Sequence, residues 1–248
     1  MELLTTVILV FLIGFVASMV GGMAAGAGFI TIPLLTILGL PPHIAIGTSK
    51  VGMLAMKAAA FVKYIKAKKV VWKYVLPLCI VSVIGSVIGA NLLIQIPEKL
   101  LSLLIGVIIL VFLPFIFIHK NAGVKRRKVS RLRTRFGYLC YGLVAVWAAF
   151  FGAGSGFFAL YTFAYLFGLT ILEAKGTSKM PQFLLDGTAI AIFAYHGIIN
   201  YFYAAVLVVS MMLGGYIGAH IGVKKGDAWV KVVIGVVIFL SAIKLIFF

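Results

Sequence analysis

The chain has 248 residues, of which 64% are hydrophobic and 11% charged, and its formal net charge is +17 at pH 7. This composition leaves too little polar surface to cover a water-soluble globule, so we expect lipid to be the main solvent of the protein. A net charge of +17 would indicate nucleic-acid binding in a soluble protein, but these basic residues lie in short runs between apolar segments, as in loops that meet anionic headgroups, and we expect no nucleic-acid partner.

Two long stretches, residues 3–49 and 136–172, contain no Asp, Glu, Lys or Arg. A spanning helix needs only about 20 apolar residues, so several helices are expected to cross the membrane. The parts of these stretches at residues 3–40 and 136–169 exceed one span and carry glycine clusters near their middles. Each part therefore predicts a helical hairpin whose arms meet at the glycines. The first stretch lacks the basic start and short apolar core of a signal peptide, so we expect it to stay in the membrane.

An internal repeat organises the chain. The sequence Gly-Thr-Ser-Lys at residues 47–50 recurs at residues 176–179, an offset of 129 residues (179 − 50). The same offset relates Gly85, Gly89, Ala90 and Gly106 to Gly214, Gly218, Ala219 and Gly235. Upstream, residues 26–29 match residues 154–157 with a shift of one residue, as expected in an irregular segment. Chance would not preserve register over such a length, so each half carries the same parts.

Three apolar segments follow the Gly-Thr-Ser-Lys turn in each half. They lie at about residues 48–66, 74–95 and 100–118, and again at about 177–196, 203–223 and 229–247. We therefore predict an all-α polytopic membrane protein with two homologous membrane repeats, residues 1–119 and 136–248, joined by a basic linker at residues 120–135. Each repeat is expected to have three spanning helices plus the glycine-broken hairpin.

Basic residues mark the loops that we expect to face the cytoplasm. They crowd residues 63–73, 119–135 and 224–231, whereas residues 197–203, the equivalent of the first basic loop, carry no charge. Because cytoplasmic loops are enriched in Lys and Arg, this pattern predicts inverted halves in a multi-pass membrane protein. Three spans plus a there-and-back hairpin supply the odd number of crossings that inversion requires. The alternative of eight plain spans would make the halves parallel and place Lys224 and Lys225 outside.

The glycine clusters are the first candidates for a substrate site. Local relaxation of helix geometry within the membrane is expected at Gly21, Gly22, Gly26 and Gly28 with Pro33, and at Gly152, Gly154 and Gly156. The candidate substrate-binding residues among and beside them are Gly26, Gly28, Gly154, Ser155 and Gly156. Backbone N–H groups freed in this way, at the positive end of a helix dipole, bind anions. The alternative is close helix packing through small residues, which we prefer for the pairs Gly85/Gly89 and Gly214/Gly218.

The repeated Gly-Thr-Ser-Lys turn offers hydroxyl groups and an ammonium group at the start of a helix in each half. Such groups can replace the hydration shell of an oxyanion. The candidate substrate-binding residues are therefore Thr48, Ser49, Lys50, Thr177, Ser178 and Lys179. The alternative is that the turn caps the helix and that the lysine only extends to the membrane interface.

Lys57 and Asp186 occupy equivalent positions in the two halves, since 57 + 129 is 186, and they carry opposite charges. Each lies about two to three turns into its predicted helix, near mid-bilayer, where an unpaired charge is costly. We expect the two to pair, and we hypothesise that Lys57 attracts the substrate and that Asp186 takes up a proton during turnover. A static structural pair is the alternative. Gln182 falls on the same helical face as Asp186 and is a further candidate for substrate binding.

These residues resemble the TauE/SafE family, also known as the sulfite exporter or toluene-sulfonate uptake permease family. The resemblance rests on the glycine-rich run from Gly21 to Gly28 followed by Pro33, on residues 45–49, and on a weaker second copy at residues 174–178. It covers nearly the whole chain, although alanines stand within the first cluster where many relatives are richer in glycine. The resemblance implies a polytopic permease of the plasma (inner) membrane, of prokaryotic type, for sulfite, sulfonates, thiosulfate or related organic anions.

The function expected from these features is secondary transport of a small anion, by alternating access around a midplane site, with protons as a candidate coupling ion and lipid as the surrounding partner. An anion channel is an alternative, but it would need neither a midplane charged pair nor broken helices. An intramembrane enzyme is another, because residues 153–156 resemble the serine motif of rhomboid proteases. That match fails at Ala153, and no His is placed to activate Ser155, so we expect no enzyme activity. Cys79 and Cys140 lack ligand spacing, so we predict no metal, cofactor or disulfide.

Overall fold

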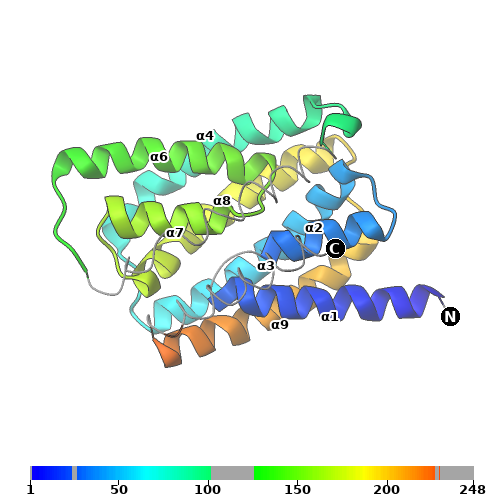
Figure 1. The fold of residues 1–248 in the computed structure, drawn as a ribbon, viewed down its shortest axis with the longest axis horizontal. Coiled ribbons are helices and arrows are strands. Elements are labelled where there is room, and N and C mark those ends of the chain that lie inside the picture. Colours follow the sequence, from blue (N-terminus) through cyan, green and yellow to red (C-terminus); the bar gives the residue numbers. More distant parts are fainter. Residues whose placement is uncertain (1, 24–26, 102–125, 227–228, 230–248) are drawn as a thin grey trace, which may run out of the picture.

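The computed structural model describes residues 2–23, 27–101, 126–226 and 229, and this part of the chain contains helices and no strand. The helices, which Figure 1 labels, are α1 (Glu2–Met23), α2 (Ala27–Ile37), α3 (Pro42–Lys66), α4 (Trp72–Gln95), α6 (Arg131–Phe150), α7 (Ser155–Leu166), α8 (Ile171–Tyr195) and α9 (Tyr201–Lys225). The predicted all-α fold is therefore confirmed for these residues. The expected spans at about 100–118 and 229–247 lie almost entirely outside the described residues.

Four of the described helices are long and apolar enough to cross a membrane: α1 from Leu4, α3, α4 and α9. Helix α8 has 25 residues, as many as α3, and would extend about 37 Å, but it carries Glu173, Lys175, Lys179 and Asp186. The last three of these side chains are buried within the bundle. The charges of α8 therefore face protein, while the apolar helices around it face outward.

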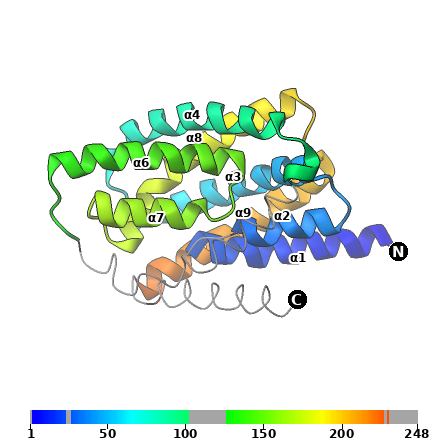
Figure 2. The ribbon, with the colours of Figure 1, turned by 45° about the horizontal axis from the view of Figure 1, so that its top comes forward.

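The two predicted hairpins are present, and each has one long arm and one short arm. Helix α1 has 22 residues and is followed by α2 with 11, while α6 has 20 residues and is followed by α7 with 12. Figure 2 shows that each short arm runs back along the long one. The second break turns at Gly152 and Gly154, whose φ values of +83° and +76° suit glycine. Gly26 lies outside the described residues.

The prediction of a turn at Gly-Thr-Ser-Lys is wrong in both halves, because these residues lie inside helices. Helix α3 already begins at Pro42, which sits in the first turn, where proline is tolerated. Helix α8 begins after Thr170, whose hydroxyl accepts from the backbone N–H of Glu173 while the Glu173 carboxylate accepts from the N–H of Thr170. This capping box was visible in the sequence as Thr-x-x-Glu, and it starts the helix five residues earlier than the glycine suggested.

Helices from before and after the linker interleave in the bundle. Helices α3 and α8 lie side by side at the centre; α3 also packs on α9, and α8 on α4, with α1 covering α9 and α6 covering α4 (Figure 1). The start of α3 lies against the α8–α9 connection, because Gly47 meets the carbonyl of Ile198. The start of α8 lies against the α3–α4 connection, where Gly176 meets the carbonyl of Lys69. The two central helices therefore run antiparallel.

Small residues line the contacts between the long helices. A Cβ at Gly89 would meet the carbonyl oxygen of Val146 on α6, and a Cβ at Gly218 would meet that of Met19 on α1. The preference for packing at these glycines is confirmed. The opposite face of α4 exposes large apolar side chains on successive turns, at Leu76, Ile80, Ile84 and Ile88. Small residues inside and large apolar residues outside are what lipid-embedded helices require.

The basic runs gather at one end of the bundle, which we call the basic end. Figures 1 and 2 show there the α3–α4 connection, the start of α6 and the end of α9, while residues 196–200 lie at the opposite end. Arg126 lies 3.7 Å from Glu173 at the start of α8, and the Lys63 ammonium lies 4.1 Å from the Tyr216 ring centre on α9. The described parts of the three basic runs therefore share one side, as the charge pattern predicted.

Adding a methyl group at Gly89 or Gly218 tests this packing. Gly89→Ala and Gly218→Ala place a Cβ against a neighbouring backbone carbonyl, which only a shift of the whole helix can relieve, so each should destabilise the protein by about 1–3 kcal/mol. Gly142→Ala is the matched control, since its Cβ would lie 3.5 Å from Val81 Cγ1, an ordinary contact. Thermal unfolding in detergent measures all three, and equal effects at positions 89 and 142 would contradict the packing.

Candidate functional site

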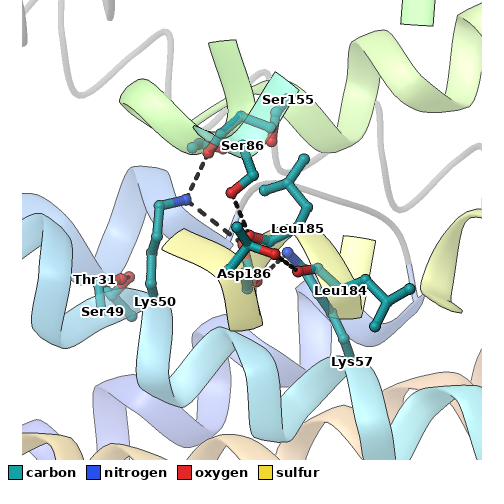
Figure 3. Close-up of polar contacts among 12 residues, drawn as sticks. Thr31, Ser49, Lys50, Lys57, Ser86, Ser155, Leu184, Leu185 and Asp186 are labelled. Carbon is teal, nitrogen blue, oxygen red and sulfur yellow. Dashed lines mark hydrogen bonds and ion pairs between the residues drawn. The ribbon is translucent and has the colours of Figure 1, made fainter. Parts of the chain in front are cut away.

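The centre of the bundle holds a buried ionic cluster, shown in Figure 3, to which α3 contributes two lysines and α8 one aspartate. The Lys57 ammonium donates to Asp186 Oδ2, and the Lys50 ammonium lies 3.6 Å from Asp186 Oδ1. The side chains of Asp186, Lys50 and Lys57 are 1%, 2% and 12% exposed. The structure thus brings together Lys57 and Asp186, the oppositely charged pair at equivalent positions, and adds Lys50 to them.

Lys50 also reaches the break between α6 and α7. Its ammonium donates to the backbone carbonyl of Ala148 at 2.5 Å, near the negative end of the α6 dipole (Figure 3). A Cβ at Gly152 would lie 3.2 Å from this ammonium group, so a glycine there leaves room for it. The first break comes to the same place, because a Cβ on Gly28 would lie 3.3 Å from the Cα of Ala153. Both glycine breaks therefore lie beside the ionic cluster.

Neutral polar groups hold the helices around Asp186. Ser86 of α4 donates to the carbonyl of Leu185 at 2.6 Å, and Ser82 shares a 2.9 Å hydrogen bond with Tyr141 of α6. Asp186 Oδ1 is buried and has no hydrogen bond among the described residues. Sequence reasoning missed Ser86 and Ala148, because nothing in the sequence signals which helix faces the charged pair, whereas Gly152 belongs to the glycine cluster that the sequence analysis singled out.

The hydroxyl groups of the two Gly-Thr-Ser-Lys segments bind other parts of the protein. Thr48 Oγ1 accepts from the N–H of Asn200, and Thr177 Oγ1 accepts from the N–H of Val71, both at 2.9 Å. Ser49 shares a 2.7 Å hydrogen bond with Thr31 of α2, and Ser178 donates to the carbonyl of Lys175 at 3.0 Å. Thr48, Ser49 and Thr177 therefore join the second turns of the central helices to the connections and to α2, while Ser178 bonds within α8.

The residues of the second glycine break form a local turn. Gly154 precedes α7, which Ser155 and Gly156 begin, and the Ser155 hydroxyl donates to the carbonyl of Gly152 at 2.6 Å. No histidine contacts this hydroxyl in the described part of the chain, and its donor is already used within the turn. The geometry gives Ser155 a role in shaping the break beside Lys50.

Helix α8 carries two further buried lysines on the face of Asp186. Lys175 and Lys179 are 4% and 3% exposed, and Gln182 is half-buried. Lys179 lies within electrostatic range of both Lys57 and Asp186. Sequence reasoning missed Lys175, although its spacing of four residues from Lys179 places both on one helical face.

Charge is unbalanced in this region. Lys50, Lys57 and Lys179 lie near one carboxylate, that of Asp186, and Lys175 lies one turn beyond Lys179, so the formal charge of these five residues is +3 (four positive, one negative). The chain has five acidic residues in all, and two others are already used at the ends of helices: Glu98 beside His43, and Glu173 in the cap of α8. The described residues contain no cluster of three metal-ligating side chains. The chemistry that suits this region is the binding of a small anion.

Removing the shared carboxylate should destabilise the bundle. Asp186→Asn leaves Lys50 and Lys57 buried without a counter-charge, and breaking such a pair costs about 3–5 kcal/mol. Glu173→Gln is the control, because it removes the largely exposed pair with Arg126 but keeps a side chain that can cap α8, so it should cost less than about 1 kcal/mol. Thermal unfolding in detergent compares them. An Asp186→Asn variant as stable as wild type would show that the lysines do not depend on this carboxylate.

Comparison with known proteins gives a family match over most of the chain. The model of the family described as "Sulfite exporter TauE/SafE" matches residues 10–245. A Haemophilus influenzae protein named "Probable membrane transporter protein" is 26% identical, covering 96% of this chain and 94% of its own length. The similar Bacillus subtilis protein YdhB is 28% identical over 95% of each chain, and Escherichia coli YfcA is 22% identical over 96% and 88%. Both carry the same description as probable membrane transporters. No solved structure matches this chain.

Proposed function

Because the chain belongs to the sulfite exporter TauE/SafE family, whose matched members are named probable membrane transporters, we propose that it is a secondary transporter for a small anion. The proposed substrates are sulfite, a related sulfur oxyanion or an organic sulfonate. The observation that carries this proposal is the net positive charge of the buried cluster around Asp186. An ammonium group buried without a counter-charge costs free energy, and a bound anion supplies that charge.

We propose that the two halves are related by a pseudo-twofold axis in the membrane plane. The support is a set of contacts that occur twice with both partners shifted by 129 residues. Thr48 accepts from Asn200, and its equivalent Thr177 accepts from Val71, the equivalent of Asn200. Likewise Gly47 meets the carbonyl of Ile198, while Gly176 meets that of Lys69. Reciprocal contacts between antiparallel helices are the pattern expected of inverted repeats.

The two reciprocal contacts are the proposed gates. One lies at the basic end, where α8 meets the α3–α4 connection, and the other lies at the opposite end, where α3 meets the α8–α9 connection. Each gate is held by a neutral hydrogen bond and by glycine packing, with no ion pair across it among the described residues. Hydrogen bonds of this kind contribute about 0.5–1.5 kcal/mol each, so opening one gate while closing the other requires little net free energy.

Asp186 is the proposed point of proton coupling. The substrate anion and the Asp186 carboxylate both need the ammonium groups of Lys50 and Lys57, so they compete for the same positive charge. Protonation of Asp186 would release both lysines to the anion, and loss of the proton would return them to Asp186. A proton and an anion would then bind together and leave together.

Sulfite flux into proteoliposomes tests the proposal. Lys57→Met and Asp186→Asn should each reduce proton-driven sulfite uptake by at least about 10-fold, because each removes a charge from the shared site. Lys225→Met is the control, since Lys225 is exposed at the end of α9, and it should keep wild-type rates. Wild-type flux in Asp186→Asn protein that elutes as a folded species would contradict the site. In a carrier, unlabelled sulfite inside the proteoliposomes should accelerate the uptake of labelled sulfite by exchange. Uptake that unlabelled internal sulfite does not accelerate would favour a channel.

Labelling of single cysteines tests the orientation. In a background with Cys79 and Cys140 replaced by serine, Lys66→Cys and Lys225→Cys should react with an impermeant maleimide only from the cytoplasmic face, and His196→Cys only from the outside. These three positions are exposed and lie at the two ends of the bundle. Labelling of positions 66 and 225 from different faces would exclude a shared basic side.

A further inference from the structure

One polar stripe on α8 has no full counterpart on α3. Lys175, Lys179, Gln182 and Asp186 are spaced by four, three and four residues, which places them on one helical face. The positions 129 residues earlier on α3 are Ile46, Lys50, Met53 and Lys57. The stripe of α8 is therefore polar at every position, whereas that of α3 alternates between apolar residues and lysine.

The two stripes lead to the central cluster from opposite ends. The stripe of α8 begins in the second turn after the basic end, and that of α3 begins in the second turn after the opposite end. On α3 the outermost position is Ile46, which is fully buried, and Met53 is 5% exposed. A charged solute that approached from that end would meet apolar side chains first. From the basic end it would meet Lys175 and then Lys179.

Both outer lysines of α8 are buried without a counter-charge in the described part of the chain. Neither ammonium group has a hydrogen bond or salt bridge there, and each side chain is less than 5% exposed. They lie one turn apart, so their charges repel. Carboxylates are scarce, since Glu98, Glu173 and Asp186 have the partners described above and Glu2 begins α1. Asp227 lies outside the described residues.

An extended lysine at the membrane interface does not explain Lys175. Its Cα lies four residues after the start of α8, about 6 Å along the axis, which a lysine side chain can span. A lysine that extended to water in this way would be largely exposed at its end, yet Lys175 is 4% exposed. The Lys175 side chain is therefore covered by protein over nearly all of its surface, and its charge lies within electrostatic range of that of Lys179.

We propose that Lys175 and Lys179 form a second anion site, an antechamber between the basic end and the central cluster that is reached from the basic end alone. This inference rests on the proposed transport function and narrows its substrate class. Two adjacent ammonium groups match an anion with two negative charges, such as a sulfur oxyanion dianion. The anion passes from this pair to Lys50 and Lys57, and the apolar stripe of α3 gives it no equivalent site on the other side.

Chemical accessibility tests the antechamber without requiring turnover. In the protein with Cys79 and Cys140 replaced by serine, Lys175→Cys is treated with an anionic sulfonate-bearing methanethiosulfonate and with its cationic trimethylammonium analogue, applied to one membrane face at a time. Each rate is normalised to the reaction with a free thiol. From the basic side the anionic reagent should react at least about 10-fold faster than the cationic one, because Lys179 remains to attract it. Ile46→Cys, the matched control, should react with neither reagent from the opposite side.

Further variants test whether Lys179 causes the preference for the anionic reagent. Adding Lys179→Gln to Lys175→Cys should remove most of the anion preference, and millimolar thiosulfate should slow the anionic reagent in the parent. Equal normalised rates for the two reagents would overturn the antechamber, as would equal reactivity at positions 46 and 175. If the preference for the anionic reagent appears only after Asp227→Asn, the two lysines pair with the Asp227 carboxylate in the wild-type protein. That result would also overturn the antechamber. Anion-selective labelling in a protein without sulfite flux would keep the antechamber and refute the transport function.

A stability measurement gives a second readout on folded protein. Lys175→Ile installs the residue found at the equivalent position of α3, so it removes a buried cation without leaving a partner unpaired. In chloride buffer this variant should unfold at a higher temperature than wild type, and sulfate should stabilise it less than it stabilises wild type. Identical stabilisation of wild type and Lys175→Ile by sulfate would contradict a dianion site at this lysine.

Discussion

The arrangement of this bundle depends on a single buried carboxylate that is shared by two lysines. Lys50 and Lys57 reach Asp186 from positions two turns apart on α3, and neither side chain is well exposed to solvent. Charges in the membrane are tolerated only where protein surrounds them and a counter-charge is near. This requirement places α3 and α8 at the centre, with α4, α6 and α9 packed around them. The same requirement brings the α6–α7 break to Lys50, since the Lys50 ammonium donates a hydrogen bond to the carbonyl of Ala148.

Shape and charge follow different symmetries in this protein. Glycines and threonines at equivalent positions make the same contacts twice, as the proposed inverted repeats would. The side chains that carry charge are not matched: Lys57 faces Asp186, and Ile46 and Met53 correspond to Lys175 and Gln182. Inverted repeats with the same backbone contacts would allow two equivalent conformations of the transporter. Because the charged side chains differ between the repeats, the substrate would meet different residues on its way from each membrane face. Together they suit a carrier whose substrate meets a different environment on each side.

The contacts at the two ends of the bundle cost little free energy to break, whereas the ion pair at its centre costs much more. In the proposed transport cycle the ends are therefore the parts that move, and the centre is the part that stays fixed. The connections at residues 69–71 and 198–200 are held by neutral hydrogen bonds and by close approach to glycine. The central ion pair is far harder to break without a proton or an anion to replace the lost partner. In the proposed transport cycle, coupling between substrate and conformation would follow from electrostatics, since Asp186 could separate from the lysines only when an anion binds them or a proton neutralises the carboxylate.

The sequence by itself determined the membrane class, the broken hairpins, the gathering of the basic runs on one side and the oppositely charged pair at positions 57 and 186. These features follow from local composition and from a period of 129 residues, which are properties of the chain alone. The start of α8 was also present in the sequence, as the capping box of Thr170 and Glu173, although the glycine that follows obscured it. Only the tertiary structure decided that the threonine hydroxyls of the two Gly-Thr-Ser-Lys segments bind the connections, that Lys50 joins Asp186, and that Lys175 is buried. Those outcomes depend on which helices pack together, and the same apolar outer faces and small inner residues recur on every helix, so no local pattern distinguishes one partner from another.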